Sequence, residues 1–166
     1  MKKDRYGYLP PHLEELLKVS HRNCNTKQGV CLLRKGGEIT MYKSFLSSIA
    51  ILLLKKPSVE NMIQKIKEVL TIDNILYFQN ATLPSLFYNE EQLSNVNLKK
   101  YNHSPLFKTY KKVVKRNKRQ LSILINGYEN FLKYLEDKTE YVDYHYLWDI
   151  VCLSLIHISE PTRPSS

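Results

Sequence analysis

Residues 104–137 read SPLFKTYKKVVKRNKRQLSILINGYENFLKYLED, and this stretch decides the predicted fold. Ser104 followed by Pro105 is typical of a helix start, because serine caps free amides and proline suits the first turn. The helical pattern then continues to about Asp137, with Gly127 as the candidate position of a kink. Its predicted apolar face consists of Val113, Val114, Leu121, Leu124, Ile125, Tyr128, Phe131, Leu132 and Leu135. The stretch therefore predicts one long helix that packs against a core.

The neighbouring segments also predict helices. Residues 42–56 are apolar on most of a helical surface, so this helix is expected to be buried and central. Ser58 is the expected cap of the next helix. A third, short helix is predicted over residues 72–79, and Asp143 is expected to open a last one. Helix following helix with short connections predicts a mainly α protein, an irregular multi-helix array.

The N-terminal region is less regular. The stretch RYGYLPP (residues 5–11) predicts a turn that leads into a short helix, with Leu13, Leu16 and Leu17 on one apolar stripe. Residues 20–37 are polar with scattered glycine, which predicts a loop. The apolar island VCLL (residues 30–33) is either a short strand or buried coil.

The last residues, LSLIHISEPTRPSS (153–166), differ from the rest. Over residues 153–163 they resemble the translation of a sequencing adaptor, and such additions are set aside before fold reasoning. A Pro/Ser-rich frayed terminus is the alternative. We expect residues 153–166 to be a non-native tail. Residues 1–152 are then a single truncated helical domain of a longer protein, because the apolar run over residues 146–151 is unlike a domain end.

Composition indicates a globular chain of 166 residues, with 43% hydrophobic and 25% charged residues. The net charge of +9 favours an anionic partner, nucleic acid first and an acidic protein surface second, although solubility alone also explains such a charge. The apolar run FLSSIAILLL (residues 45–54) is shorter than the roughly 20 residues that span a membrane. Cys24, Cys31 and Cys152 are too few for a disulfide scaffold, so we interpret them as reduced thiols.

The strongest local feature is a basic run with seven positive charges in twelve positions. Around a helix these side chains cover more than half the circumference, so several must project into solvent together. Phosphate binding requires such an array, whereas the alternative is a solvated helix face. The flanking Tyr101, Phe107 and Tyr110 could stack on bases, but aromatic residues at this spacing are more often core. The predicted nucleic-acid-binding residues are Lys108, Lys111, Lys112, Lys115, Arg116, Lys118 and Arg119.

Other chemistry has weaker support. Zinc ligands could be drawn from His12, His21, Cys24 and Cys31, but the close cysteine pair of a zinc finger is missing. The acid–base candidates Asp143, His145 and Asp149 are expected to lie on different helix faces. Lys35-Gly36-Gly37 lacks the rest of a phosphate-binding loop. The sequence predicts no catalytic site, no metal and no cofactor, and so no enzyme.

Five short segments occur in a recognisable order: RYGYLP (5–10), CLLR (31–34), SFLSSIA (44–50), FQN (78–80) and DYHYLWDIV (143–151). Together they resemble an internal segment of a long protein of giant viruses and other nucleocytoplasmic large DNA viruses. Those proteins are described as similar to the large subunit of the poxvirus early transcription factor. The similarity covers most of residues 5–152, and the order of the segments carries it.

The resemblance implies a non-catalytic promoter-binding initiation factor. Such a factor acts with a helicase-like ATPase subunit and recruits the viral RNA polymerase to promoter DNA, in factories in the host cytoplasm or in the virion. It supplies no functional residue within this segment. Two alternatives remain: a helical protein–protein interaction module, and a virion structural or packaging protein of the same viruses without direct DNA contact.

Overall fold

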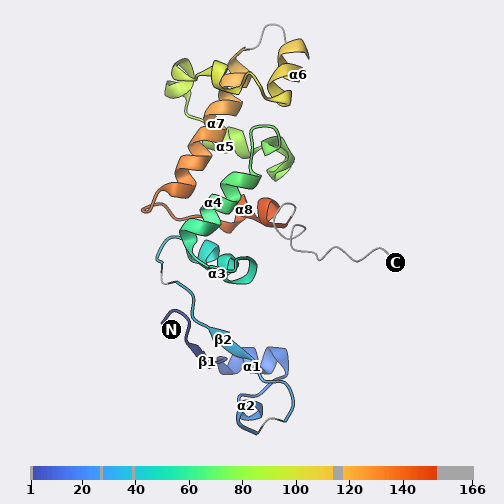
Figure 1. Cartoon of the computed structure of the whole chain (residues 1–166), viewed down its shortest axis with the longest axis vertical. Helices are drawn as coiled ribbons and strands as arrows, with labels where there is room; N and C mark the ends of the chain where they lie inside the picture. Colours follow the sequence, from blue (N-terminus) through green and yellow to red (C-terminus); the bar gives the residue numbers. More distant parts are fainter. Residues whose placement is uncertain (1, 27, 39, 114–117, 153–166) are drawn as a thin grey trace, which may run out of the picture.

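The computed structural model describes residues 2–26, 28–38, 40–113 and 118–152, and of residues 111–113 the backbone only. It is mainly helical, as predicted, with one small two-stranded sheet (Figure 1). In chain order the elements are β1 (Tyr6–Tyr8), α1 (Pro11–Leu17), α2 (Arg22–Thr26), β2 (Leu33–Lys35), α3 (Ser44–Leu53), α4 (Val59–Val69), the 3₁₀ turns η1 (Ile75–Tyr77) and η2 (Gln79–Ala81), α5 (Leu83–Phe87), the 3₁₀ turns η3 (Glu90–Asn95) and η4 (Leu98–Tyr101), α6 (Pro105–Val113), α7 (Lys118–Glu136) and α8 (Tyr144–Ile150).

The hydrophobic core lies between α3, α4, α5, α7 and α8. The predicted apolar face of the long helix is confirmed along α7, where Ile125, Phe131 and Leu135 are fully buried. Leu46 of α3 and Met62 of α4 are equally buried. Apolar burial of this kind contributes about 25 cal/mol per Å² removed from water, so this layer of helices is the main source of stability.

The predicted long helix consists of two separate helices in the described residues. The Tyr110 hydroxyl of α6 donates a hydrogen bond to the Gln120 side chain of α7. In one straight helix these positions would be about 15 Å apart along the axis. The prediction of a single helix is therefore corrected: α6 lies beside the beginning of α7 (Figure 1). Val114, Lys115 and Arg116 fall outside the described residues.

Gly127 marks a close helix contact and not a kink. Helix α7 continues through it, and a Cβ atom built on Gly127 would lie 2.0 Å from the carbonyl oxygen of Pro84 in α5. On either side, the Asn126 carboxamide oxygen accepts from the backbone N–H of Asn89 at 2.7 Å, and Asn130 Nδ2 donates to the Phe87 carbonyl at 3.0 Å. The glycine thus lets the backbone of α5 rest directly on α7.

Three predicted helix caps are confirmed, and one predicted helix is wrong. Ser104 Oγ accepts from the N–H of Phe107 at 3.2 Å at the start of α6. Ser58 Oγ accepts from the N–H of Asn61 at 3.0 Å, and Asp143 caps α8. Over residues 72–79 the structure has only the turn η1, because the Asn74 side chain bonds the backbone of Thr71 and Val69 and closes a tight turn. A left-handed run follows, with φ of 50°, 51° and 64° at residues 79, 80 and 81.

The N-terminal segment forms a sheet that the sequence did not predict. β1 pairs antiparallel with β2, with Tyr6 opposite Lys35, Gly7 opposite Arg34 and Tyr8 opposite Leu33. The strand alternative for residues 30–33 is therefore correct in kind but shifted along the chain. The observed strand starts at Leu33, and its residues are exposed. The predicted turn before α1 contains the other strand. The hydrophobic core includes no described residue before Leu46, so this segment stands apart from the helical body.

Within the described residues, no helix combines the length and the apolar character that spanning a bilayer requires.

Replacing Gly127 by Ala tests the contact with α5. Alanine in a helix is normally favourable by up to about 1 kcal/mol relative to glycine. Here the added methyl would meet backbone atoms of Pro84, so we expect the free energy of unfolding to fall by about 1–3 kcal/mol. Urea unfolding followed by circular dichroism measures the change. Ser122→Ala, elsewhere on α7, is the control. A stabilised Gly127→Ala protein would contradict the close packing.

Candidate nucleic-acid interface

The structure places three of the seven predicted residues on its surface. Lys108 is exposed on α6, and Lys118 and Arg119 are exposed in the first described turn of α7. Lys111 and Lys112 belong to α6, but their side chains are not among the described ones. Lys115 and Arg116 lie outside the described residues. The described members of the basic run therefore lie on two helices that are neighbours in the fold.

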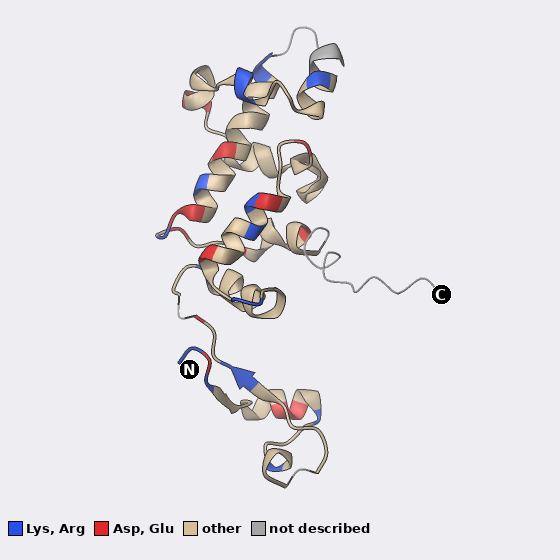
Figure 2. Ribbon diagram, in the orientation of Figure 1, with Lys and Arg blue, Asp and Glu red and all other residues tan. Residues whose placement is uncertain are grey.

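The fold brings two further cations to the same end, Lys99 and Lys100 of η4. Between residues 97 and 120 the sequence has nine of its 25 basic residues and none of its 16 acidic ones. The other 16 basic residues are therefore matched by 16 acidic residues, and the whole net charge of +9 originates in this stretch. Figure 2 shows the described part of it gathered at one end of the helical body, around α6 and the start of α7. We call this surface the basic end.

Two of these cations have acidic partners. Arg119 forms an ion pair with Glu90 at 2.6 Å, and Lys100 forms one with Glu129 at 2.7 Å. Among the described residues, Lys99, Lys108 and Lys118 have no ion-pair partner. The strongest positive field is therefore expected around these three lysines.

The neighbouring aromatic rings are packing residues and offer no platform for bases. Phe107 is buried in the core. The Tyr101 hydroxyl donates to Glu129 at 2.9 Å, and its ring packs edge-on against Tyr128. Tyr110 is half-buried and bonded to Gln120. The core interpretation of these aromatic residues thus holds, and what the basic end presents is charge.

Glu129 links the basic end to the core. Burial would raise its pKa, but the hydrogen bonds from Lys100 and Tyr101 outweigh burial and lower the pKa of this carboxyl. Burial, together with the hydrogen bond to Glu129, raises the pKa of Tyr101 to about 12. The hydrogen bond to Glu129 raises the pKa of the Lys100 ammonium group.

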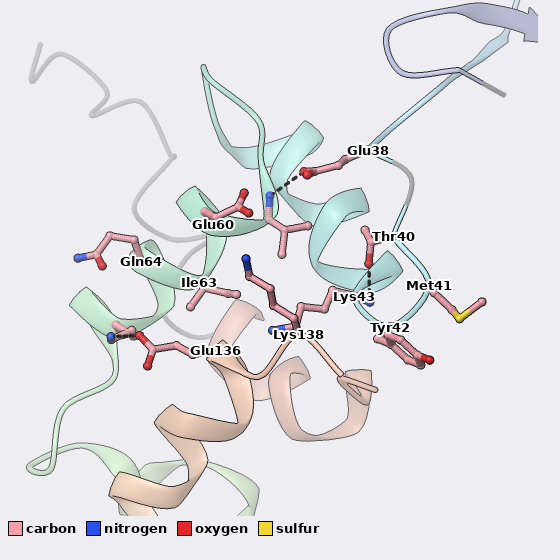
Figure 3. Close-up of a pocket in the computed structure, with 12 residues that line it drawn as sticks. Glu38, Thr40, Met41, Tyr42, Lys43, Glu60, Ile63, Gln64, Glu136 and Lys138 are labelled. Carbon is pink, nitrogen blue, oxygen red and sulfur yellow. Dashed lines mark hydrogen bonds and ion pairs between the residues drawn. The ribbon is translucent and has the colours of Figure 1, made fainter. Parts of the chain in front are cut away.

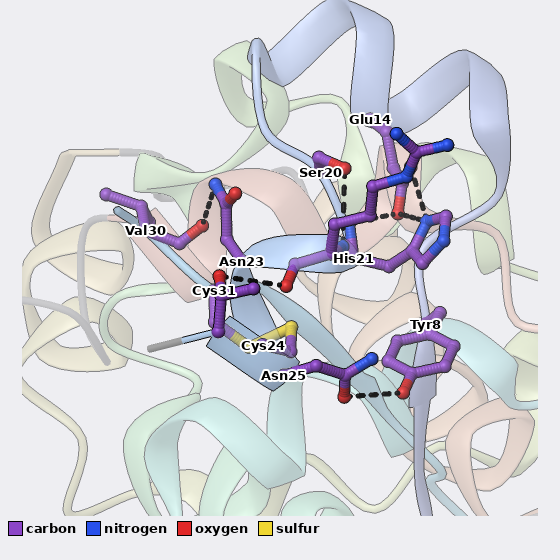
Figure 4. The surroundings of a disulfide bond; sticks show 11 residues. Tyr8, Glu14, Ser20, His21, Asn23, Cys24, Asn25, Val30 and Cys31 are labelled. Atoms are coloured by element: carbon purple, nitrogen blue, oxygen red, sulfur yellow. Dashed lines mark hydrogen bonds and ion pairs between the residues drawn. A yellow bond between two sulfur atoms is a disulfide. The ribbon is translucent and has the colours of Figure 1, made fainter. Parts of the chain in front are cut away.

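The candidate zinc ligands Cys24, Cys31 and His21 form other contacts in the structure. Cys24 and Cys31 form a disulfide with their Cα atoms 4.8 Å apart, so the prediction of reduced thiols is wrong for these two residues (Figure 4). His21 contacts the Glu14 carboxylate at 3.1 Å and packs against the Tyr8 ring. In the described ranges no three His, Cys, Asp or Glu residues come together as metal ligands. Cysteine number and spacing alone gave no signal for this pairing.

The acid–base candidates on α8 act as local caps. His145 Nδ1 lies 2.7 Å from Asp143 Oδ1, so these two side chains meet, contrary to the prediction that all three diverge. Their contact belongs to the cap, in which Asp143 also accepts from the His145 backbone N–H. Asp149 points elsewhere and accepts from the backbone N–H of Gln79 at 2.9 Å.

A pocket of about 410 Å³ lies between α3, α4 and the end of α7 (Figure 3). Lys43, only 5% exposed, donates from Nζ to the Leu135 carbonyl near the end of α7, and burial lowers the pKa of its ammonium group. Glu38 accepts from the first N–H of α4, and Lys67 pairs with Glu136. These charged groups bind helix ends, so these residues of the pocket lining have a structural role.

Comparison of the chain with family models, with curated proteins and with solved structures finds no match.

The variant Tyr101→Phe tests the contact between Tyr101 and Glu129, and the property compared is stability at alkaline pH. Unfolded tyrosines ionise near pH 10, whereas the pKa of folded Tyr101 is about 12. The unfolded state therefore loses the proton first, and the free energy of unfolding falls as pH rises from about 10 to about 12. We expect the phenylalanine variant to lose less stability over this range in thermal unfolding. Tyr77→Phe, at an exposed ring, should keep the parent profile. Identical profiles for all three proteins would contradict the assignment.

Replacing both Cys24 and Cys31 by Ser tests the disulfide. A cross-link over a separation of seven residues is worth about 2–3 kcal/mol in the chain-entropy account, so we expect faster hydrogen exchange across β1 and β2. Exchange in α7 should not change, because the segment shares no core with the helices. Cys152→Ser is the control. Unchanged protection of β1 and β2 in the double variant would show that the disulfide is dispensable.

Proposed function

We propose that this chain is part of a viral early transcription initiation factor subunit that binds promoter DNA through its basic end. One observation carries the proposal: the entire net charge of +9 arises from residues 97–120, which include no acidic residue. Counter-ion release from DNA rewards such a concentration of cations, because each neutralised phosphate frees a condensed ion. Residues 1–35 also carry a net charge of +5, but they mix eight basic with three acidic residues, so residues 97–120 remain the one-sided concentration of cations.

The side chains that neighbour the basic end favour a DNA duplex, and not a single strand, as its ligand. Proteins that bind single strands combine a basic groove with aromatic rings on which bases stack. The aromatic rings beside this surface are engaged within the protein: Phe107 is buried and the Tyr101 hydroxyl is bonded to Glu129. Lysines on helices that pack on a core suit the regularly spaced phosphates of a duplex. Such contacts fix position and carry little sequence information.

The resemblance adds the partners and the location to the proposal. We propose a non-enzymatic role beside a helicase-like ATPase subunit and the viral RNA polymerase, in viral factories of the host cytoplasm or in the virion. The disulfide between Cys24 and Cys31 supports the virion over the cytoplasm, because disulfides are rare where cellular reductants act.

Reversing three lysines tests the basic end directly. In the variant Lys99→Glu, Lys108→Glu, Lys118→Glu we expect affinity for a duplex oligonucleotide to fall roughly 10-fold or more. The dependence of affinity on salt should also become shallower, by about one unit of log–log slope for each phosphate that the variant no longer neutralises. Fluorescence anisotropy over a range of salt concentrations measures both, and circular dichroism checks that the helix content is unchanged.

The matched control is Lys18→Glu, Lys55→Glu, Lys56→Glu, which changes net charge equally at exposed positions away from the basic end. It should keep most of the affinity. Equal decreases of affinity in both triple variants would assign binding to overall charge and not to this surface. Tighter binding to a single strand than to the duplex would remove the duplex assignment.

A further inference from the structure

One face of the two-stranded sheet at the N-terminus is only partly covered, where His21 and Asn25 contact Tyr8. Because side chains alternate along a strand, Tyr6, Tyr8, Leu33 and Lys35 share one face. Tyr6 is 65% exposed, Tyr8 50% and Leu33 43%. Helices α1 and α2 contribute no buried residue, so neither of them builds a core on the sheet. A sheet of this size is marginal in water unless another layer packs on it.

The backbone of β2 is also free on its outer side. The sheet has the order β1–β2, so each strand has one unpaired edge in the described structure. Among the described residues, no backbone or side-chain group outside β1 forms a hydrogen bond with the backbone of Leu33, Arg34 or Lys35. An exposed strand edge of this kind is a template for another strand.

The charge around this edge is positive. Residues 1–35 contain eight basic and three acidic residues. Two of the acids are engaged internally, Asp4 with Lys35 at 3.2 Å and Glu14 with His21 at 3.1 Å. Arg34 is exposed on β2 and has no ion-pair partner among the described side chains. A strand that joins β2 would place its own side chains opposite Leu33, Arg34 and Lys35.

We propose that the free edge of β2 binds an extended acidic segment of a partner protein, which adds a third strand to the sheet. Opposite charges across neighbouring strands stabilise pairing, so an acidic residue of the partner faces Arg34, whose side chain lies on the opposite face from Leu33 and Lys35. An aliphatic residue of the partner packs on Leu33. The disulfide between Cys24 and Cys31 holds the loop that leads into β2, and so fixes the edge before the partner arrives.

A protein segment fits this edge better than the other occupants do. Single-stranded nucleic acid would use the tyrosines but would gain nothing from Leu33 or from the free backbone groups. A second copy of the chain would bring eight basic and three acidic residues against an identical set, which opposes pairing. The edge also lies at the far end of the molecule from the basic end (Figure 1), so this proposal stands without DNA binding.

The test uses a labelled synthetic peptide in which glutamate alternates with valine, and the full chain. We expect saturable binding by fluorescence anisotropy, and at least a 10-fold decrease of affinity in Arg34→Glu. Arg22→Glu makes the same change of charge in the same segment but off the strand, and should bind as the parent does. The same peptide N-methylated at every residue has no backbone N–H on either edge, so it cannot add as a strand and should not bind. Hydrogen exchange of the free variant shows whether the sheet is intact.

Several results would overturn the proposal. One is equal affinity of the parent and Arg34→Glu for the peptide, and another is equal binding of a lysine–valine peptide. Retained binding of the N-methylated peptide would exclude strand addition. Displacement of the peptide by an oligo-dT single strand would assign the edge to nucleic acid, and a dimer in sedimentation that Arg34→Glu abolishes would assign it to a second copy. The lysine reversals at the basic end should leave peptide affinity unchanged, so the two proposals fail independently.

Discussion

The contact between the backbone of α5 and Gly127 of α7 is the constraint on which the helical body depends. With Pro84 lying directly on the glycine, the two helices approach more closely than any side chain allows. Asn126 and Asn130 then satisfy the backbone groups of the segment that leaves α5. Buried backbone groups without partners are costly, so these bonds are what allow a five-residue helix to lie in the core. Phe87 at the end of α5 fills the remaining space against Phe131.

The left-handed turn before α5 connects the contact between α5 and α7 to helix α8. Residues in this conformation cost free energy unless their surroundings fix them. Here Asp149 accepts from the N–H of Gln79, and the Gln79 side chain donates to the His145 carbonyl. Near the C-terminal end of α7, Lys43 joins α3 to the Leu135 carbonyl, which a helix end would otherwise leave free. Helix α7 is thus held at its middle by its own Asn126 and Asn130 side chains and near its C-terminus by Lys43 from the start of α3.

The sequence predicted the local features well and the contacts between distant segments poorly. The apolar face of α7 and the caps at Ser58 and Asp143 follow from patterns within a few residues, and the structure confirms them. The pairing of β1 with β2 joins segments nearly thirty positions apart, and nothing local in YGY or LRK specifies it. The function of Gly127 was equally hidden, because a glycine that permits a helix contact has the same local pattern as one that permits a kink.

The basic end also combines local features that the sequence predicts with contacts between distant segments that it does not predict. Charge is a property of composition, so the basic run could be read from the sequence. The contribution of Lys99 and Lys100 depends on how η4 returns to α6 and α7, and no periodicity carries that information. The aromatic residues around the run were ambiguous, because stacking on bases and packing in a core use the same residue types. Only the buried position of Phe107 and the hydrogen bond from Tyr101 to Glu129 distinguish the two uses.

The position of the cations along α7 gives one more reason to regard the basic end as a binding surface. Lys118 and Arg119 lie in the first described turn of α7, whereas Glu129 and Glu136, the acidic residues of this helix, lie in its second half. The last turn of α7 carries both signs, Lys133 and Glu136, so the one-sided positive charge belongs to the start of its described part. If the basic end binds DNA, as we propose, phosphates would neutralise this positive charge. The free edge of β2 lies at the opposite end of the molecule, so the two surfaces that we propose as binding sites would not compete for the same space.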